Sequence, residues 1–212
     1  MEKYEFHDAT VGSLKRCQIS NRDDLELVVD LGHQPLCDSL LSLEQLDQPE
    51  KTFPLRITRS RSLGHTQLDY VVDGAEVFHR EYPYRCGVTK EVVEHHQIQA
   101  KASVKLLGLK PDSLIVDVGS NDGTLLKQYQ GLGMKVMGVE PTNVANYAKK
   151  KNGVPTIQSF FTEEVARDIS EKKGPAQLIT ATNVFAHMST MGEVIRGIQA
   201  LLADDGFFVF EN

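Results

Sequence analysis

The chain has 212 residues, of which 41% are hydrophobic and 25% are charged, and its formal net charge is −6 at pH 7. This composition is ordinary for a globular protein, and the length gives room for one medium domain and a small one. The negative charge and the lack of a dominant basic run argue against a nucleic-acid partner. No signal peptide and no apolar run near roughly 18 residues is present in the sequence, so we expect no membrane association and a cytoplasmic protein.

Residues 1–88 predict a small β-rich module. Apolar and polar residues alternate over residues 25–31, which predicts a half-buried strand that stops at the Gly- and Pro-containing turn 32–35. Residues 53–58 contain a proline and therefore predict an edge strand or a loop. Residues 66–72 predict a further extended segment.

The three cysteines, Cys17, Cys37 and Cys86, are widely spaced and odd in number. They form no C-x-x-C pair, so neither a disulfide framework nor a complete zinc knuckle can be derived from them. We expect reduced thiols.

The segment 89–110 predicts a helix that bridges the module to the rest of the chain. Thr89 is a suitable N-cap, and Gly108 ends the helical pattern. His95 and His96 lie on this helix, and we expect them at solvent or boundary positions rather than as metal ligands.

Residues 111–212 alternate between apolar strands and amphipathic helices, which predicts a parallel α/β sheet with right-handed crossovers. The expected strands are 114–118, 135–140, 156–157, 177–181 and 207–211, and the expected helices are 124–130, 143–151, 163–169 and 191–202. The last strand carries four consecutive apolar residues and would lie at a sheet edge.

A glycine-rich loop follows the first of these strands, where open α/β sheets bind ligands. Its spacing differs from the G-x-G-x-x-G of dinucleotide folds, and Asp117 and Asp122 would repel a pyrophosphate. Such a loop suits a ligand with an ammonium group and ribose hydroxyls, such as S-adenosylmethionine, although a generic Rossmann-like domain stays an alternative. The candidate cofactor-binding residues are Asp117, Gly119, Ser120, Asn121, Asp122 and Gly123.

Two further strand ends carry polar candidates. Glu140 ends the second strand, 23 residues after Asp117, where a carboxylate can accept hydrogen bonds from ribose hydroxyls. Asn183 follows the fourth strand as a candidate cofactor or substrate contact. His187 is a candidate for either catalysis or helix capping.

Together these residues resemble the nucleotide-sugar C-methyltransferases of deoxysugar biosynthesis. The resemblance spans nearly the whole chain, and it includes Glu140-Pro141 and Phe210-Glu211. Its main stretches are Leu31-Gly32-His33-Gln34-Pro35-Leu36, Glu81-Tyr82-Pro83-Tyr84-Arg85, Asp117 to Leu126 and Asn183-Val184-Phe185-Ala186-His187. It implies a Rossmann-like class I methyltransferase sheet and S-adenosylmethionine-dependent methyl transfer to a sugar carbon beside a keto group.

Such a reaction needs a base for the α-proton and a partner for the enolate. By resemblance, Tyr84 contacts the substrate or the enolate. The family places acid-base residues after the fifth strand, commonly a glutamate followed by a histidine. Glu211 fits this pattern, whereas Asn212 occupies the histidine position and cannot act as a general base.

The resemblance also implies a structural zinc held by two C-x-x-C pairs in the N-terminal module. Here Cys17 is kept, and Ser20 stands at the other position of the first pair. The second pair falls at Ser60 and Leu63, with Gly64 and Gln67 beyond it. One thiolate cannot anchor zinc, so we expect no metal site in this module.

The family's sheet and a further C-terminal domain extend beyond the position that corresponds to Asn212. We therefore expect an N-terminal fragment of such an enzyme, truncated after the fifth strand. One alternative is a non-catalytic remnant or the partner-binding half of a split methyltransferase, completed by a separately encoded C-terminal segment. An NAD-dependent oxidoreductase is a third alternative, disfavoured by the loop spacing.

Overall fold

The computed structural model describes residues 8–212, which belong to two compact units. The first unit extends to His79 and includes Ser189–Gly192. The second contains Arg80–Met188 and Glu193–Asn212. The boundary between the two units lies between residues 79 and 80, whereas the sequence pattern suggested that the β-rich module ends at residue 88. The helix expected to bridge the two parts, α2 (Lys90–Leu106), belongs to the second unit.

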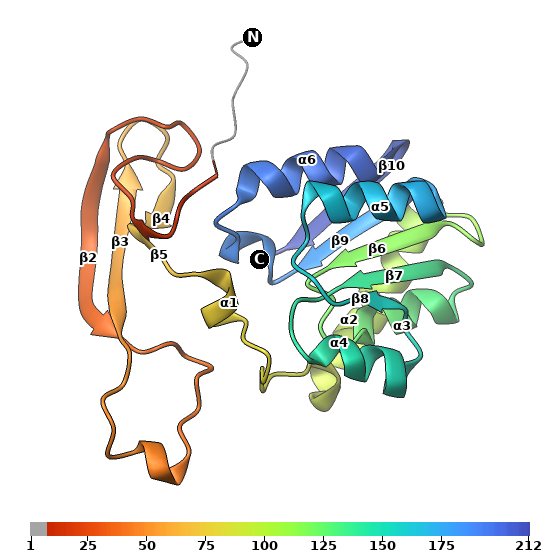
Figure 1. The fold of residues 1–212 in the computed structure, drawn as a ribbon. Helices are drawn as coiled ribbons and strands as arrows, with labels where there is room; N and C mark the ends of the chain where they lie inside the picture. The colour runs from red at the N-terminus through yellow and green to blue at the C-terminus, as the bar shows by residue number, and fades with distance from the viewer. Residues whose placement is uncertain (1–7) are drawn as a thin grey trace. The chain divides into compact units, whose positions relative to one another are not determined.

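The second unit is built on a five-stranded parallel sheet in the order β10-β9-β6-β7-β8 (Figure 1). This confirms the predicted α/β class. The strands are β6 (Leu114–Val118), β7 (Lys135–Val139), β8 (Thr156–Ile157), β9 (Ala176–Thr182) and β10 (Leu202–Glu211). All five were expected from the sequence, and β10 lies at the sheet edge as expected.

Helices cover both faces of this sheet, and a hydrophobic core lies between the sheet and the helices on each face. Side chains alternate along β6, so this strand contributes to both cores. Leu114, Val116 and Val118 pack towards α5 (Glu163–Lys173) and α6 (Met191–Leu201), while Ile115 packs towards α2 and α3 (Thr124–Gly131). The helices are α2, α3 (Thr124–Gly131), α4 (Val144–Tyr147) with a π turn at Ala148–Asn152, α5 (Glu163–Lys173) and α6 (Met191–Leu201).

The strand order places a topological switch point between β6 and β9. The chain leaves β6 towards β7 and β8 on one side, and it returns to β9 and β10 on the other. The carboxyl ends of β6 and β9 therefore border the position where open α/β sheets bind ligands.

The first unit holds a three-stranded antiparallel sheet in the order β2-β3-β4 and a separate pair, β1 with β5. The bounds are β1 (Gly12–Ser13), β2 (Leu25–Gln34), β3 (Phe53–Ser60), β4 (Thr66–Leu68) and β5 (Tyr70–Val71), with a short helix α1 at Gly74–Val77.

The strands predicted at 25–31 and 53–58 are present, but details of three strand predictions for this unit were wrong. The strand β2 continues through the expected turn to Gln34, and Leu27, Val28 and Leu31 are all more than half exposed, so its alternation does not mark a buried face. The segment 66–72 forms two short strands in different sheets instead of one.

The third error concerns β3, which is the central strand of its sheet although it contains Pro54. Its neighbour β4 pairs only with Ile57–Arg59, so the proline lies beyond the reach of this ladder. A missing N–H is therefore tolerated at that position.

The part of the chain that the structure describes contains no helix long and apolar enough to cross a membrane.

Candidate functional site

The glycine loop between β6 and α3 folds back onto β7. The amides of Gly119 and Ser120 both donate to the Val139 carbonyl, at 2.8 and 3.1 Å. Gly119, Asn121 and Gly123 all have positive φ, at 69°, 49° and 76°. Glycine is the residue that adopts this backbone without strain, which explains two of the three positions. The loop is thus a preformed backbone turn at the switch point.

Glu140, at the end of β7, fixes this loop. Its Oε2 accepts the Asn121 amide at 3.0 Å, and its Oε1 accepts the Thr142 amide at 2.9 Å. The residue is only 5% exposed. Each carboxylate oxygen has two lone pairs, so both retain capacity for a further hydrogen bond such as one from a ribose hydroxyl.

Asp117 lies inside the sheet and is 4% exposed. Its Oδ1 accepts the Thr180 hydroxyl from β9 at 2.6 Å. Burial raises the pKa of this carboxyl to about 7, and the nearby charge of Glu140 adds to the rise while the Thr180 bond opposes it. A cation placed beside Asp117 would favour its ionised form.

Asn121 and Asp122 hold the segment that precedes α2. The Asn121 side chain accepts the Cys86 amide at 2.9 Å and donates to the Tyr84 carbonyl at 3.2 Å. The Asp122 carboxylate accepts the Gly87 amide at 2.9 Å and the Thr124 hydroxyl at 2.5 Å. Both side chains are thus used to dock residues 84–87 onto the loop.

Two buried hydroxyls near the switch point have no hydrogen-bond partner among the described residues: Ser120 Oγ in the loop and Thr182 Oγ1 at the end of β9. A Cβ added at Gly119 would lie 2.6 Å from the Val184 side chain, so the loop and the segment after β9 are in close contact. Orphaned polar atoms beside a glycine loop fit a ligand with several hydrogen-bonding groups.

Tyr84 is half exposed, and its hydroxyl neighbours Cys86. Burial, and then the Cys86 side chain and the charge of Asp122, raise the pKa of Tyr84 above its usual value. Burial also raises the pKa of Cys86 to about 11. Both groups therefore stay protonated near neutral pH, and Tyr84 is available as a hydrogen-bond donor.

Asn183 and His187 follow β9 and are both exposed. Asn183 has a positive φ of 54°, and its amide donates to the Glu211 carbonyl at 2.7 Å. His187 ends a short 3₁₀ turn at Phe185–His187. The side chain of Asn212 accepts the Ala186 amide at 3.3 Å, so it caps this turn.

Glu211 has a partner that the sequence did not indicate. Its Oε2 lies 2.7 Å from Nε2 of His95 on α2, and the two side chains are 40% and 52% exposed. Because 116 residues separate them, no local pattern could have linked the two.

His96, the residue after His95, is buried. The expectation of a solvent or boundary position was therefore wrong for His96. It lies on the helix face that also buries Ala100 and Ser103.

The structure therefore joins the candidate residues into two groups. Glu140, Asn121 and Tyr84 are connected through the glycine loop, and Asn183, Glu211 and His95 are connected at the ends of β9 and β10. Gly119 of the loop lies close to Val184, the residue after Asn183. The assignment of roles to these residues stays a prediction.

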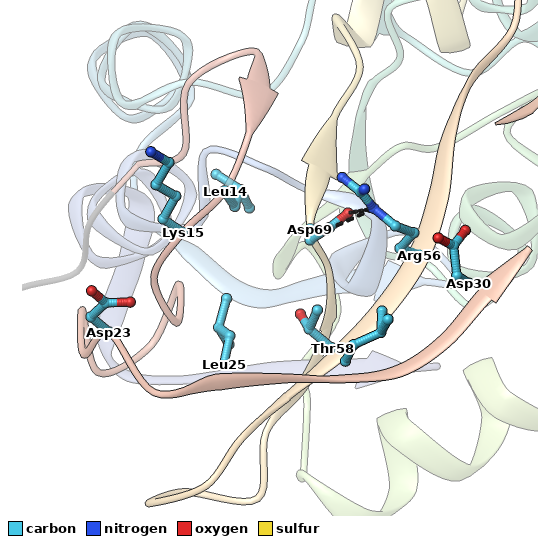
Figure 2. A pocket seen from close by; sticks show the side chains of 9 residues that line it. Leu14, Lys15, Asp23, Leu25, Asp30, Arg56, Thr58 and Asp69 are labelled. Carbon is cyan, nitrogen blue, oxygen red and sulfur yellow. Dashed lines mark hydrogen bonds and ion pairs between the residues drawn. The ribbon is translucent and has the colours of Figure 1, made fainter. Parts of the chain in front are cut away.

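An open hollow of about 410 Å³ lies in the first unit, apart from every predicted site residue. Figure 2 shows Arg56 turned towards Asp69, and their closest atoms are 2.9 Å apart. The charges of Arg56 and Asp69 are therefore paired with each other. The hollow is lined by Leu14, Lys15, Asp23, Leu25, Leu27, Asp30, Arg56, Thr58 and Asp69.

Comparison with known families agrees with this geometry. A family model described as "Methyltransferase domain" matches residues 93–212, more than half of the chain. The chain belongs to this methyltransferase family. This agrees with the predicted S-adenosylmethionine cofactor class and disfavours an NAD-dependent oxidoreductase. A second model, described as "Putative zinc binding domain", matches residues 17–78.

The chain is also similar to the C-methyltransferase NovU of Streptomyces niveus, with 33% identity over 202 residues. The match covers 95% of this chain and 48% of NovU, so the chain spans about half the length of this relative. Among solved structures, it is similar to an S-adenosylmethionine-dependent methyltransferase of Anabaena variabilis, with 18% identity, 55% and 50% coverage of the two chains and a TM-score of 0.46. A protein of the same organism described as "Putative methyltransferase from antibiotic biosynthesis pathway" gives 20% identity, 53% and 44% coverage of the two chains and a TM-score of 0.44.

Proposed function

We propose that this chain carries the cofactor-binding part of an S-adenosylmethionine-dependent C-methyltransferase that acts on a nucleotide-linked keto-deoxysugar. The observation that carries the proposal is the preformed glycine loop at the switch point, tied to Glu140 by a 3.0 Å hydrogen bond. The similarity to NovU, a C-methyltransferase, supports carbon as the methyl acceptor. That the chain is the N-terminal part of a longer cytoplasmic enzyme stays a prediction.

The residues of the second unit fit such a cofactor. We assign Glu140 to the ribose hydroxyls and Asp117 to the amino group, which their buried carboxylates support. The Ser120 hydroxyl, which has no partner among the described residues, supports a further polar contact. When bound, S-adenosylmethionine supplies an electrophilic methyl group. The chain then has to orient the acceptor carbon towards it and exclude water.

Tyr84 suits a role at the enolate oxygen. The enolate carries negative charge, and a protonated hydroxyl can donate to it. The raised pKa keeps the Tyr84 hydroxyl protonated, and Asn121 holds its backbone in place. We therefore propose Tyr84 as a donor and not as the base.

Glu211 and His95 suit the acid-base role. Asn212 cannot accept the α-proton, but the imidazole of His95 lies 2.7 Å from the Glu211 carboxylate. A carboxylate hydrogen-bonded to an imidazole orients the ring. We propose that this pair handles the α-proton, with His187 as the second candidate on the neighbouring turn.

A methyl-transfer assay tests this function. The purified chain would be incubated with methyl-labelled S-adenosylmethionine and a nucleoside-diphosphate keto-deoxysugar, and the sugar product analysed by NMR. The proposal expects a new C-methyl signal that the variant Glu211→Gln reduces by about 10²-fold or more, as for loss of general acid-base catalysis. The proposal would be overturned if the chain binds the cofactor but transfers no methyl group, both alone and with an added C-terminal segment.

A second candidate function is the partner-binding half of a split methyltransferase. The exposed edge of β10 favours it, because Phe207 and Phe210 are 43% and 53% exposed on this edge strand. Unpaired, apolar strand edges pair readily with another segment. Co-expression with a separate C-terminal segment would test this candidate. It predicts co-purification and transfer activity only in the complex, and full activity of the chain alone would rule it out.

A further inference from the structure

Two turns in the first unit share one backbone design. We call them the knuckles: knuckle 1 is residues 17–22 and knuckle 2 is residues 60–65. In each, the amide of the first residue donates to the carbonyl five positions later, at 3.0 Å in knuckle 1 and 2.8 Å in knuckle 2. The amide of the fifth residue donates back to the first carbonyl, at 2.8 Å in both.

The side-chain contacts within the knuckles also correspond. The amide of the fourth residue points at the first side chain: Ser20 N lies 3.5 Å from Cys17 Sγ, and Leu63 N lies 3.4 Å from Ser60 Oγ. The fifth residue has a positive φ in both, 54° at Asn21 and 70° at Gly64. Amides aimed at the first side chain of a C-x-x-C turn would stabilise a thiolate ligand.

The first side chains of the two knuckles lie together in the interior. Cys17 is 1% exposed and Ser60 is fully buried. Burial raises the pKa of the Cys17 thiol, but hydrogen bonds with Ser20 and Ser60 outweigh it, so the pKa is lowered. The first positions of the two knuckles, two of the four that would carry metal ligands, therefore lie close together.

The side chains at these positions do not fit zinc. They offer one thiol, the hydroxyls of Ser20 and Ser60, and the alkyl group of Leu63, whereas structural zinc sites use four cysteine or histidine ligands. In residues 8–212 the structure holds no group of three His, Cys, Asp or Glu side chains that could bind a metal. Residues 17–78 therefore match a zinc-binding family model although they lack a set of zinc ligands.

Hydrogen bonds link the two knuckles and the residues that follow them. The Ser60 hydroxyl lies 3.0 Å from both carboxylate oxygens of Asp24, which follows knuckle 1. Asp24 also accepts the Ser62 amide at 2.8 Å. The buried Gln67, which follows knuckle 2, accepts the Gln18 amide at 2.9 Å and donates to the Arg16 carbonyl at 3.2 Å.

We propose that the first unit is a metal-free form of a two-knuckle zinc module, in which the Asp24–Ser60 and Gln67 hydrogen bonds take over the cross-linking role of the metal. The unit folds without zinc and does not respond to chelators. Its backbone nevertheless keeps the geometry of a zinc site, so cysteines at the ligand positions would restore metal binding.

The first test is the metal content and chelator response of the unchanged full chain. After expression with added zinc, the proposal expects below roughly a tenth of an equivalent of zinc per chain by mass spectrometry. It also expects EDTA to leave the melting temperature of the chain within about 1 °C. One zinc per chain, together with a lowered melting temperature in EDTA, would overturn the proposal.

The second test restores the ligands in the triple variant Ser20→Cys, Ser60→Cys and Leu63→Cys. We expect one equivalent of Co²⁺ with the visible absorption of tetrahedral thiolate coordination, and zinc should then raise the melting temperature. The matched control adds Cys17→Ser to the triple variant and should bind at least about 10-fold more weakly. A folded triple variant that binds Co²⁺ no better than the unchanged chain would contradict the proposal.

Discussion

At the residue scale, Glu140 fixes the glycine loop by accepting the Asn121 amide, and it is the proposed contact of the cofactor's ribose. Replacing it by glutamine keeps the shape but weakens charge-assisted hydrogen bonds, which contribute about 1.5–3 kcal/mol each. We expect Glu140→Gln to weaken S-adenosylhomocysteine binding by about 10- to 100-fold in calorimetry. The control is Glu171→Gln at an exposed position of α5. Equal affinities of the two variants for S-adenosylhomocysteine would show that Glu140 does not contribute to cofactor binding.

Asp117 makes stability depend on pH. Its pKa is raised from 3.8 to about 7 in the folded chain, so the native state binds a proton that the unfolded state releases. The stability contributed by this proton is fully present below pH 3.8 and is lost as the pH rises to about 7. Asparagine keeps the acceptor for Thr180 but has no charge to bury.

We therefore expect Asp117→Asn to stabilise the chain more at pH 8 than at pH 5, by on the order of 2 kcal/mol, in urea unfolding. The same difference at both pH values would show that Asp117 does not carry the raised pKa.

At the element scale, the glycine loop and the segment after β9 depend on each other. Alanine at Gly119 would need a left-handed backbone, which costs about 1 kcal/mol, and its Cβ would meet Val184 at 2.6 Å. We expect Gly119→Ala to lower stability by about 2–3 kcal/mol, measured by chemical unfolding. Adding Val184→Ala should recover the steric part and leave the backbone cost. Full additivity of the two changes would argue against the contact.

Asn121 connects the loop to the segment before α2, and hydrogen exchange can detect this connection. Without its side chain, the Cys86 amide loses its acceptor. We expect Asn121→Ala to speed amide exchange at residues 84–87 by about 10-fold, as for loss of roughly 1.4 kcal/mol of local protection. The exposed Asn146→Ala is the control and should leave these amides unchanged. Similar protection in both variants would mean that other contacts hold the segment.

The elements of the sheet domain could be predicted because their signals are local. The apolar run of β6, the glycines after it and the apolar face of α6 each fix one element without distant contacts. The first unit was harder, since short strands such as β4 and β5 are defined by their partners. The His95–Glu211 pair and the Tyr84–Asn121 bond join distant segments, so single-sequence patterns could not reveal them.

At the scale of the whole molecule, two compact units carry different parts of the account. The first unit keeps the backbone of a metal site but holds it with hydrogen bonds. The second unit belongs to the methyltransferase family and presents a preformed loop at its switch point. The metal-free proposal concerns the first unit and cofactor binding concerns the second, so each can fail without the other.

Cofactor binding by the full chain tests the central claim most directly. Calorimetric titration with S-adenosylhomocysteine should show a single site and, at saturation, a higher melting temperature, because a ligand that binds only the native state stabilises it. A 100-fold excess of ligand over its dissociation constant should stabilise the chain by about 2.7 kcal/mol. NADH, tested in parallel, should produce neither effect. A folded chain that gives no heat and no thermal shift with S-adenosylhomocysteine would contradict the account.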